Sequence, residues 1–80
     1  MNWDDAKAAC ADLGDGWRLP TKDELNILYI NKHKIGGFAN VGYWSSSEIQ
    51  VHPYAWIQNF DSGNQSKENK NEEYIVRAIR

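Results

Sequence analysis

The sequence predicts a compact α+β domain in which two helices are followed by a short antiparallel β-sheet with long loops. Two segments within residues 1–40 have apolar side chains at helical spacing, and each begins at a capping residue. Glycines end both segments, and no helical period follows residue 41. Short aromatic and β-branched runs follow instead, which are typical of strands. Helices that precede strands in this way indicate segregated α and β parts.

The first predicted helix begins after Asn2, whose side chain is a good N-cap. Gly14 and Gly16 end it, because glycine readily leaves the helical conformation. Its apolar stripe is expected to face the core and consists of Trp3, Ala6, Ala9, Cys10 and Leu13.

The second predicted helix begins at a capping box made by Thr21 and Glu24. It should run to about Lys34, and Gly36 and Gly37 end it. Its inner face is predicted to carry Leu25, Leu28, Tyr29 and Ile35.

Three strands are predicted in the second half of the chain, at residues 43–47, 55–60 and 74–79. Residues 61–64 form a turn after the second of these strands. One face of that strand is expected to carry Trp56, Gln58 and Phe60.

No hydrophobic residue lies between Phe60 and Tyr74. Such a segment would be disordered in isolation, because it has no apolar surface to bury. Because it is held between two predicted strands, this segment is predicted to be a long surface loop, and such loops are often functional.

Length and charge limit the classes of function. Eighty residues fit one domain, with a helical scaffold half at 1–40 and a strand and loop half at 41–80 that carries the candidate ligand face. The net charge of −2 and the scattered Lys and Arg residues argue against nucleic-acid binding. No apolar run is long enough to insert into a membrane. The acidic N-terminus does not resemble a signal peptide, so the sequence leaves localisation open.

The reactive residue types do not form a recognisable catalytic or metal-binding pattern. Cys10 lies on a predicted apolar stripe, where a free cysteine is most often a small hydrophobic residue, and being alone it forms no internal disulfide. His33 and His52 lack nearby ligands at zinc spacing. Ser45–Ser47 lacks a nucleophile elbow and a nearby His–Asp pair, so these serines are expected to bond local backbone groups.

Two further motifs carry little signal for a bound group. Gly36–Gly37 is an ordinary helix stop and does not form a phosphate-binding loop. The carboxylates and amides of Asp61–Glu73 leave a weak calcium site open as an alternative, although their spacing follows no known calcium loop. We therefore predict no catalytic residues, no resident metal and no cofactor.

A ligand-binding surface is predicted around Pro53, which marks an exposed turn. Aromatic side chains on rigid loops are typical binding anchors, since they offer large area at low entropic cost. The competing interpretation is that these residues complete the core. The apolar and aromatic group consists of Ile49, Val51, His52, Pro53, Tyr54 and Ile57.

Several motifs together resemble the bacterial and phage C-type-lectin-like domains, including a family with the pattern WRLPT…WSSSE…VRAVR. The resemblance covers nearly the whole chain in the same order, through Gly16–Thr21, Glu24–Leu25, Tyr43–Glu48, Ala55–Trp56, Phe60 and Val76–Arg80. It implies a C-type-lectin-like fold related to the formylglycine-generating-enzyme branch. The catalytic cysteines of those enzymes and the calcium and sugar motifs of animal lectins are absent from this chain.

Within this group the chain is most similar to the variable proteins of diversity-generating retroelements. In those proteins a reverse transcriptase rewrites adenines near the 3′ end of the gene, so that Asn codons become codons for other residues. The framework implied by the resemblance includes Trp44, Trp56, Phe60 and Arg77. The implied ligand positions, all reachable from an Asn codon, are Val41, Gly42, Ile49, Val51, His52, Pro53, Tyr54, Ile57, Asn59, Asp61, Ser62, Asn64, Asn69 and Asn71.

The resemblance also implies a partner and a place of action. These positions should form a solvent-exposed face that recognises a protein or cell-surface ligand, and the family suggests the virion or cell surface. Family members usually carry an N-terminal strand before the first helix, so residues 74–80 are expected to have an open edge here. Either a second subunit or a longer parent protein could cover that edge, and of these a homo-oligomer is expected. The alternative function is a structural or adhesin domain of a bacterial surface or secreted protein, with no diversified site.

Overall fold

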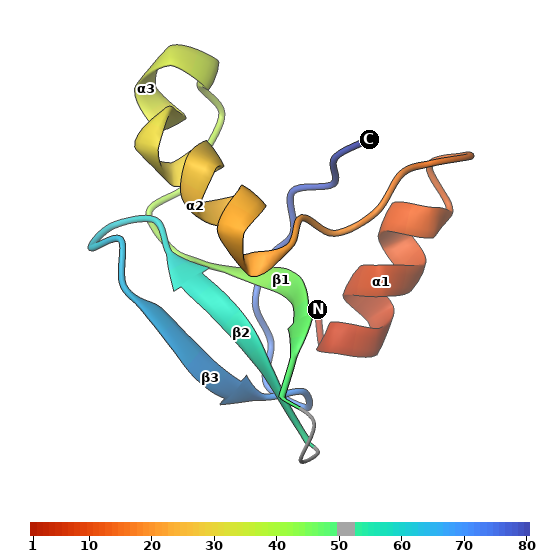
Figure 1. Cartoon of the computed structure of the whole chain (residues 1–80). Coiled ribbons are helices and arrows are strands. Elements are labelled where there is room, and N and C mark those ends of the chain that lie inside the picture. The colour runs from red at the N-terminus through yellow and green to blue at the C-terminus, as the bar shows by residue number, and fades with distance from the viewer. Residues whose placement is uncertain (50–52) are drawn as a thin grey trace.

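A computed structural model of the chain describes residues 1–49 and 53–80, and these form an α+β domain (Figure 1). Three helices come first: α1 (Trp3–Ala11), α2 (Lys22–Ile30) and the short α3 (Lys32–Ile35). Three strands follow, β1 (Gly42–Glu48), β2 (Tyr54–Asn59) and β3 (Gln65–Asn69). They form one antiparallel sheet in the order β1-β2-β3. None of the helices described is long and apolar enough to cross a membrane.

The predicted helix starts are confirmed by their caps. Asn2 Oδ1 accepts a hydrogen bond from the Asp5 N–H at 2.9 Å. The Thr21–Glu24 capping box is complete, with both side chains bonded to each other's backbone N–H groups. Each cap satisfies N–H groups that the first helical turn would otherwise leave without a partner.

The predicted second helix is too long, because it ends at Ile30 and α3 begins after Asn31. The Asn31 backbone leaves the helical region, and its side-chain amide caps the Ile27 carbonyl at 2.9 Å. As a result Ile35 is exposed and does not belong to the inner face. Leu13 is also exposed, because α1 has already ended when the chain reaches it.

Hydrophobic clusters cover both faces of the sheet, since successive strand residues point to opposite sides. Tyr43 belongs to one cluster and the neighbouring Trp44 to the other. The first cluster lies against α1 and the chain end and contains Trp3, Ala6, Cys10, Leu19, Trp44, Ala55 and Ile57, with Tyr74, Val76 and Ala78 packed on it. The second lies against α2 and contains Leu25, Tyr43 and Phe60, with Leu28, Tyr29 and Phe38 packed on it.

The polar segment after Phe60 is not only a surface loop, because it contains the strand β3. Its turn at residues 61–64 is confirmed, and the chain then pairs with β2 from Gln58↔Gln65 to Tyr54↔Asn69. Backbone hydrogen bonds to β2 hold this strand, although its own side chains are all polar.

Residues 74–79 are extended, yet they do not form the continuous strand predicted from the sequence. Ile75 bridges Tyr43 in parallel, whereas Ile79 bridges Arg18 in antiparallel. Because the segment changes partner between these two points, no ladder develops. The expected open edge is closed at Tyr74, whose N–H donates to the Met1 carbonyl (3.0 Å) and whose carbonyl accepts from the Met1 ammonium (2.8 Å).

Candidate ligand-binding surface

The fourteen predicted ligand positions do not form a single face. Some of these positions are described by the structure and are exposed or half-buried. They fall into two groups, one at each end of β2 and so at each end of the sheet (Figure 1). From Tyr54 to Asn59, β2 spans about 17 Å at the usual rise per strand residue. We call one group the Tyr54 end: Ile49, Pro53, Tyr54, Asn69 and Asn71. We call the other the hairpin end: Val41, Asn59, Asp61, Ser62 and Asn64. Val51 and His52 lie outside the described residues.

Gly42 and Ile57 are not on the surface, so their predicted exposure is wrong. Ile57 is 6% exposed and belongs to the first hydrophobic cluster. A Cβ atom added at Gly42 would lie 2.7 Å from the Tyr74 ring and 3.1 Å from Ile57 Cδ1. Both positions are therefore part of the framework, because the face of the sheet that they occupy is covered by α1 and residues 74–78.

At the hairpin end, several side chains are already used to build the turn. Asn59 Oδ1 accepts hydrogen bonds from the N–H groups of Asp61 (2.8 Å) and Ser62 (3.3 Å). Ser62 Oγ accepts from the Asn64 N–H at 3.2 Å. The backbone carbonyl of Val41 anchors the start of the turn by accepting from the Phe60 N–H at 2.9 Å. Varying Asn59 or Ser62 would therefore disturb the turn itself.

Gly63 fixes the hairpin end against α2. Its φ of 84° lies in the left-handed region, and an added Cβ would be 2.7 Å from the Tyr29 ring. A residue without a side chain is required both for the backbone conformation and for the close approach to Tyr29. The hairpin end is thus closely packed on the second hydrophobic cluster.

At the Tyr54 end, the contacts found among the described residues are mostly between backbone groups. The Tyr54 carbonyl accepts from the Ile49 N–H at 3.0 Å, and Tyr54 pairs with Asn69 of β3 on its other side. The Pro53 carbonyl accepts from the Lys70 N–H at 2.8 Å. Tyr54 remains 42% exposed, and Pro53 is exposed beside it. Asn69 is the exception, because its Oδ1 accepts from the Asn71 N–H at 2.9 Å.

The family model for the Lcl C-terminal domain matches residues 1–80, which is the whole chain. The chain belongs to the Lcl C-terminal domain family. No curated protein matches it. The match includes all the residues that carry the resemblance described above, so that resemblance is supported at the level of the family.

In this Lcl C-terminal domain, Lys70 anchors the Tyr54 end to α1. Its side chain is only 12% exposed, and its ammonium lies 2.7 Å from Glu48 Oε1 and 4.3 Å from the centre of the Trp3 ring. The Trp3 N–H donates to the Lys70 carbonyl at 3.0 Å. This role could not be predicted from the sequence, because Lys70 lies in a polar stretch and its partners are far from it along the chain.

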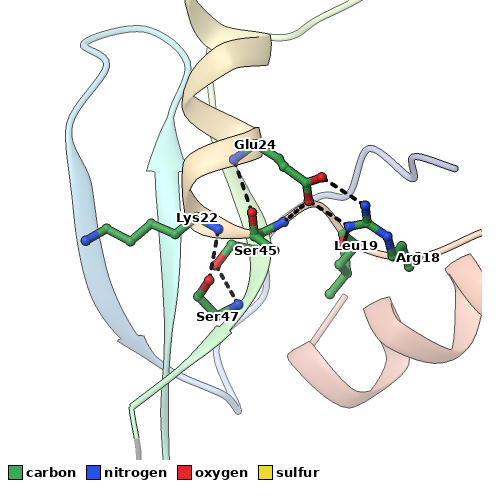
Figure 2. Close-up of polar contacts among 7 residues, drawn as sticks. Arg18, Leu19, Lys22, Glu24, Ser45 and Ser47 are labelled. Carbon is green, nitrogen blue, oxygen red and sulfur yellow. Dashed lines mark hydrogen bonds and ion pairs between the residues drawn. The ribbon is translucent and has the colours of Figure 1, made fainter.

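Ser45 and Ser47 of this Lcl C-terminal domain bond backbone groups; the partner is local, as predicted, in one bond and lies on a neighbouring element in the other two. Figure 2 shows the Lys22 N–H donating to Ser47 Oγ (2.9 Å), and the Ser47 N–H donating to Ser45 Oγ (3.2 Å). Ser45 Oγ itself donates to the Trp56 carbonyl at 2.7 Å. These bonds hold the start of α2 on the strands from which the candidate surface extends.

An ion pair joins the segment before α2 to the first turn of that helix. Arg18 donates to both oxygens of Glu24, at 2.6 and 2.8 Å (Figure 2). This guanidinium and the Thr21 N–H lower the pKa of Glu24 to about 2.

Burial raises the pKa of the Cys10 thiol in the first hydrophobic cluster.

Within residues 1–49 and 53–80, His, Cys, Asp and Glu do not gather in a group of three or more that could hold a metal ion. Within the Asp61–Glu73 segment of the weak-calcium alternative, the amide oxygen of Asn69 already accepts from the Asn71 N–H at 2.9 Å.

Proposed function

We propose that this Lcl C-terminal domain is a non-catalytic binding module that recognises a protein or cell-surface ligand through the Tyr54 end. Recognition would depend on the shape and the aromatic contacts of that end. The rest of the chain serves as a rigid frame on which these side chains can change without unfolding the domain. The finer form of the proposal is that the chain is a variable protein of a diversity-generating retroelement on a C-type-lectin-like scaffold.

The exposure of Tyr54 on a fixed backbone is the observation that carries this proposal. Its main chain is hydrogen-bonded to Ile49 on one side and paired with Asn69 on the other, while the residue remains 42% exposed. A tyrosine presented in this way offers a large contact area and loses little conformational freedom on binding. Pro53 beside it is exposed and has a restricted backbone of its own.

The chemistry of the neighbourhood favours a protein surface as the ligand. Ile49 and Pro53 supply apolar area, and the Asn71 side chain supplies an amide that can both donate and accept hydrogen bonds. Glu48 and Lys70 pair with each other, so their charges offset one another at this end. A mixed aromatic, apolar and amide surface of low net charge is typical of protein-recognising surfaces.

A comparison of natural copies of the gene from independent isolates tests the proposal. Substitutions should concentrate at Ile49, Pro53, Tyr54 and Asn71. A matched control is the exposed face of α1, at Asp4, Ala8 and Ala11. Equal substitution rates at the two sets would overturn the proposal and favour a structural or adhesin domain with tolerant loops.

A further inference from the structure

The outer edge of β3 carries backbone groups that no strand among the described residues uses. β3 lies at one end of the sheet order β1-β2-β3, and within residues 1–49 and 53–80 it pairs only with β2. Next to this ladder, the Lys70 N–H donates to the Pro53 carbonyl at 2.8 Å. Bonded and non-bonded pairs alternate along an antiparallel ladder, so Trp56↔Lys67 is a non-bonded pair. The N–H and C=O groups of Lys67 therefore point away from β2, and those of Gln65 do the same.

Two lysines place positive charge on the sheet face that leads to this edge. The exposed Lys67 side chain lies beside its cross-strand partner Trp56. The Lys22 ammonium lies 3.8 Å from the centre of the same Trp56 ring, and Figure 2 shows this side chain extending from the start of α2 across the sheet. Gln65 Nε2 donates to the Lys22 carbonyl at 2.9 Å and so holds the start of α2 against β3. Among the residues that the structure describes, neither ammonium has an ion-pair partner.

We infer that the outer edge of β3 binds an extended acidic peptide segment of a partner protein, which adds to the sheet as an antiparallel strand. Main-chain hydrogen bonds to Gln65 and Lys67 hold the segment, as in other cases of strand addition. A carboxylate opposite Lys67 lies on the same face as its ammonium, and the charge of Lys22 attracts the same ligand. The inference goes beyond the proposed function, because strand addition does not require the exposed Tyr54 side chain.

A second copy of the chain fits this edge poorly. Lys67 is the middle residue of the five in β3, so a two-fold antiparallel pairing centred on this strand places the Lys67 side chains of the two copies opposite each other. Like charges directly opposite each other destabilise a strand pair, and lysine on an edge strand protects against self-pairing. A carboxylate in the same position is attracted instead. The charge of this edge therefore favours an acidic strand over a second copy.

Titration of the isotope-labelled chain with a synthetic peptide, followed by nuclear magnetic resonance, tests this inference. The probe is a capped peptide of about seven residues in which Glu and Thr alternate, because threonine favours strands. At low salt it should half-saturate the chain at roughly 1 mM. It should shift the amide signals of Gln65 and Lys67 and slow hydrogen exchange at the Lys67 amide, which attraction between charges alone would not do.

Two altered peptides separate strand addition from simple charge attraction. A peptide with Gln in place of each Glu should bind about fivefold more weakly, because it loses the attraction to the lysines. A peptide methylated on the backbone nitrogens of its two central Glu residues keeps its charge but cannot donate to the β3 carbonyls. It should bind about fivefold more weakly as well. Equal binding of the methylated peptide overturns the inference, since the edge would then attract any polyanion.

A charge reversal at the edge completes the test. Lys67→Glu should weaken binding of the acidic peptide by about fivefold or more and improve binding of a peptide with Lys in place of Glu. Lys34→Glu is the matched control, because Lys34 is exposed in α3 and the change in net charge is the same. It should change the affinity by no more than about twofold. Near-ultraviolet circular dichroism checks the fold of each variant.

Three other results contradict the inference. One is the absence of shifts at the β3 amides up to roughly 5 mM acidic peptide. Another is an equal loss of affinity in Lys67→Glu and Lys34→Glu. The third is a shift of the same amides with chain concentration alone, which would show that a second copy occupies the edge.

Discussion

Ile57 and Tyr54 provide the sharpest test of which predicted ligand positions belong to the frame. Both lie on β2, and both were assigned to the ligand face from the sequence. The structure buries Ile57 at 6% exposure, whereas Tyr54 is 42% exposed. Replacing each in turn with alanine removes a large side chain from one strand in both cases. The environment of the removed side chain differs between the two positions.

The expected costs follow from that environment. Ile57→Ala leaves a cavity beside Gly42 and the first hydrophobic cluster, and such changes cost about 2–5 kcal/mol. Tyr54→Ala removes a side chain that is partly in water, and we expect about 1 kcal/mol or less. A domain of 80 residues has a total stability of roughly 4–12 kcal/mol, so the first change removes a large part of it.

Thermal unfolding followed by tryptophan fluorescence separates the two outcomes. For a domain of this size, Ile57→Ala should lower Tm by more than about 10 °C, and Tyr54→Ala by about 6 °C or less. Equal losses for the two variants would refute the assignment of Ile57 to the core. A nearly neutral Ile57→Ala would show that Ile57 is exposed, as the sequence predicts.

Three further predictions follow from single contacts. Gly42→Ala should destabilise the domain by about 1–3 kcal/mol in urea unfolding, because the new Cβ would press on Tyr74, and little change would contradict the close packing there. Glu24→Gln should cost up to about 1 kcal/mol at neutral pH, since the ion pair with Arg18 is partly exposed. The pKa of Glu24 is lowered in the folded state, so its contribution to the free energy of unfolding is present above pH 4.5 and is lost as pH falls towards about 2. The loss of stability caused by Glu24→Gln should therefore shrink over this pH window, and a constant loss would contradict the pairing. Finally, Cys10 is buried with a raised pKa, so a thiol reagent should modify it only at the rate of unfolding, and rapid modification of the folded chain would show that it is accessible.

The helical half could be predicted well because its signals are local. Asn2, Thr21 and Glu24 act on backbone groups within three residues, so the sequence alone contains both partners of each cap. The break at Asn31 was missed because helical periodicity continues through it, and only its backbone angles separate α2 from α3.

The sheet half was harder because its partners are distant in sequence. The shared face of Trp56, Gln58 and Phe60 agrees with the contacts of Gln58 with Asn26 and of Phe60 with Tyr29. The error at Ile57 came from treating the opposite face as solvent, when α1 and residues 74–78 cover it. β3 could not be foreseen, because its polar side chains give no strand signal and only pairing with β2 defines it.

The residue types of the candidate surface could be predicted from the sequence, but their positions in space could not. Residue types reachable from an Asn codon can be found in the sequence, but the division into two ends depends on hairpin geometry. Asn59, Ser62 and Asn69 are residue types that can be reached from an Asn codon, yet their side chains hold turns by hydrogen bonds. Lys70 was missed because its anchoring depends on Trp3 and Glu48, which lie far from it in the chain.

Sequencing the DNA around the 3′ end of the gene tests the central claim most directly. The account predicts a near-copy of the segment that encodes residues 43–80, beside a reverse-transcriptase gene, with differences only where that copy carries adenine. Those differences should fall in the codons of Ile49, Pro53, Tyr54 and Asn71 and spare those of Trp44 and Ile57. A copy whose adenine positions fall mainly in framework codons, or the absence of any copy, would contradict a diversified Tyr54 end.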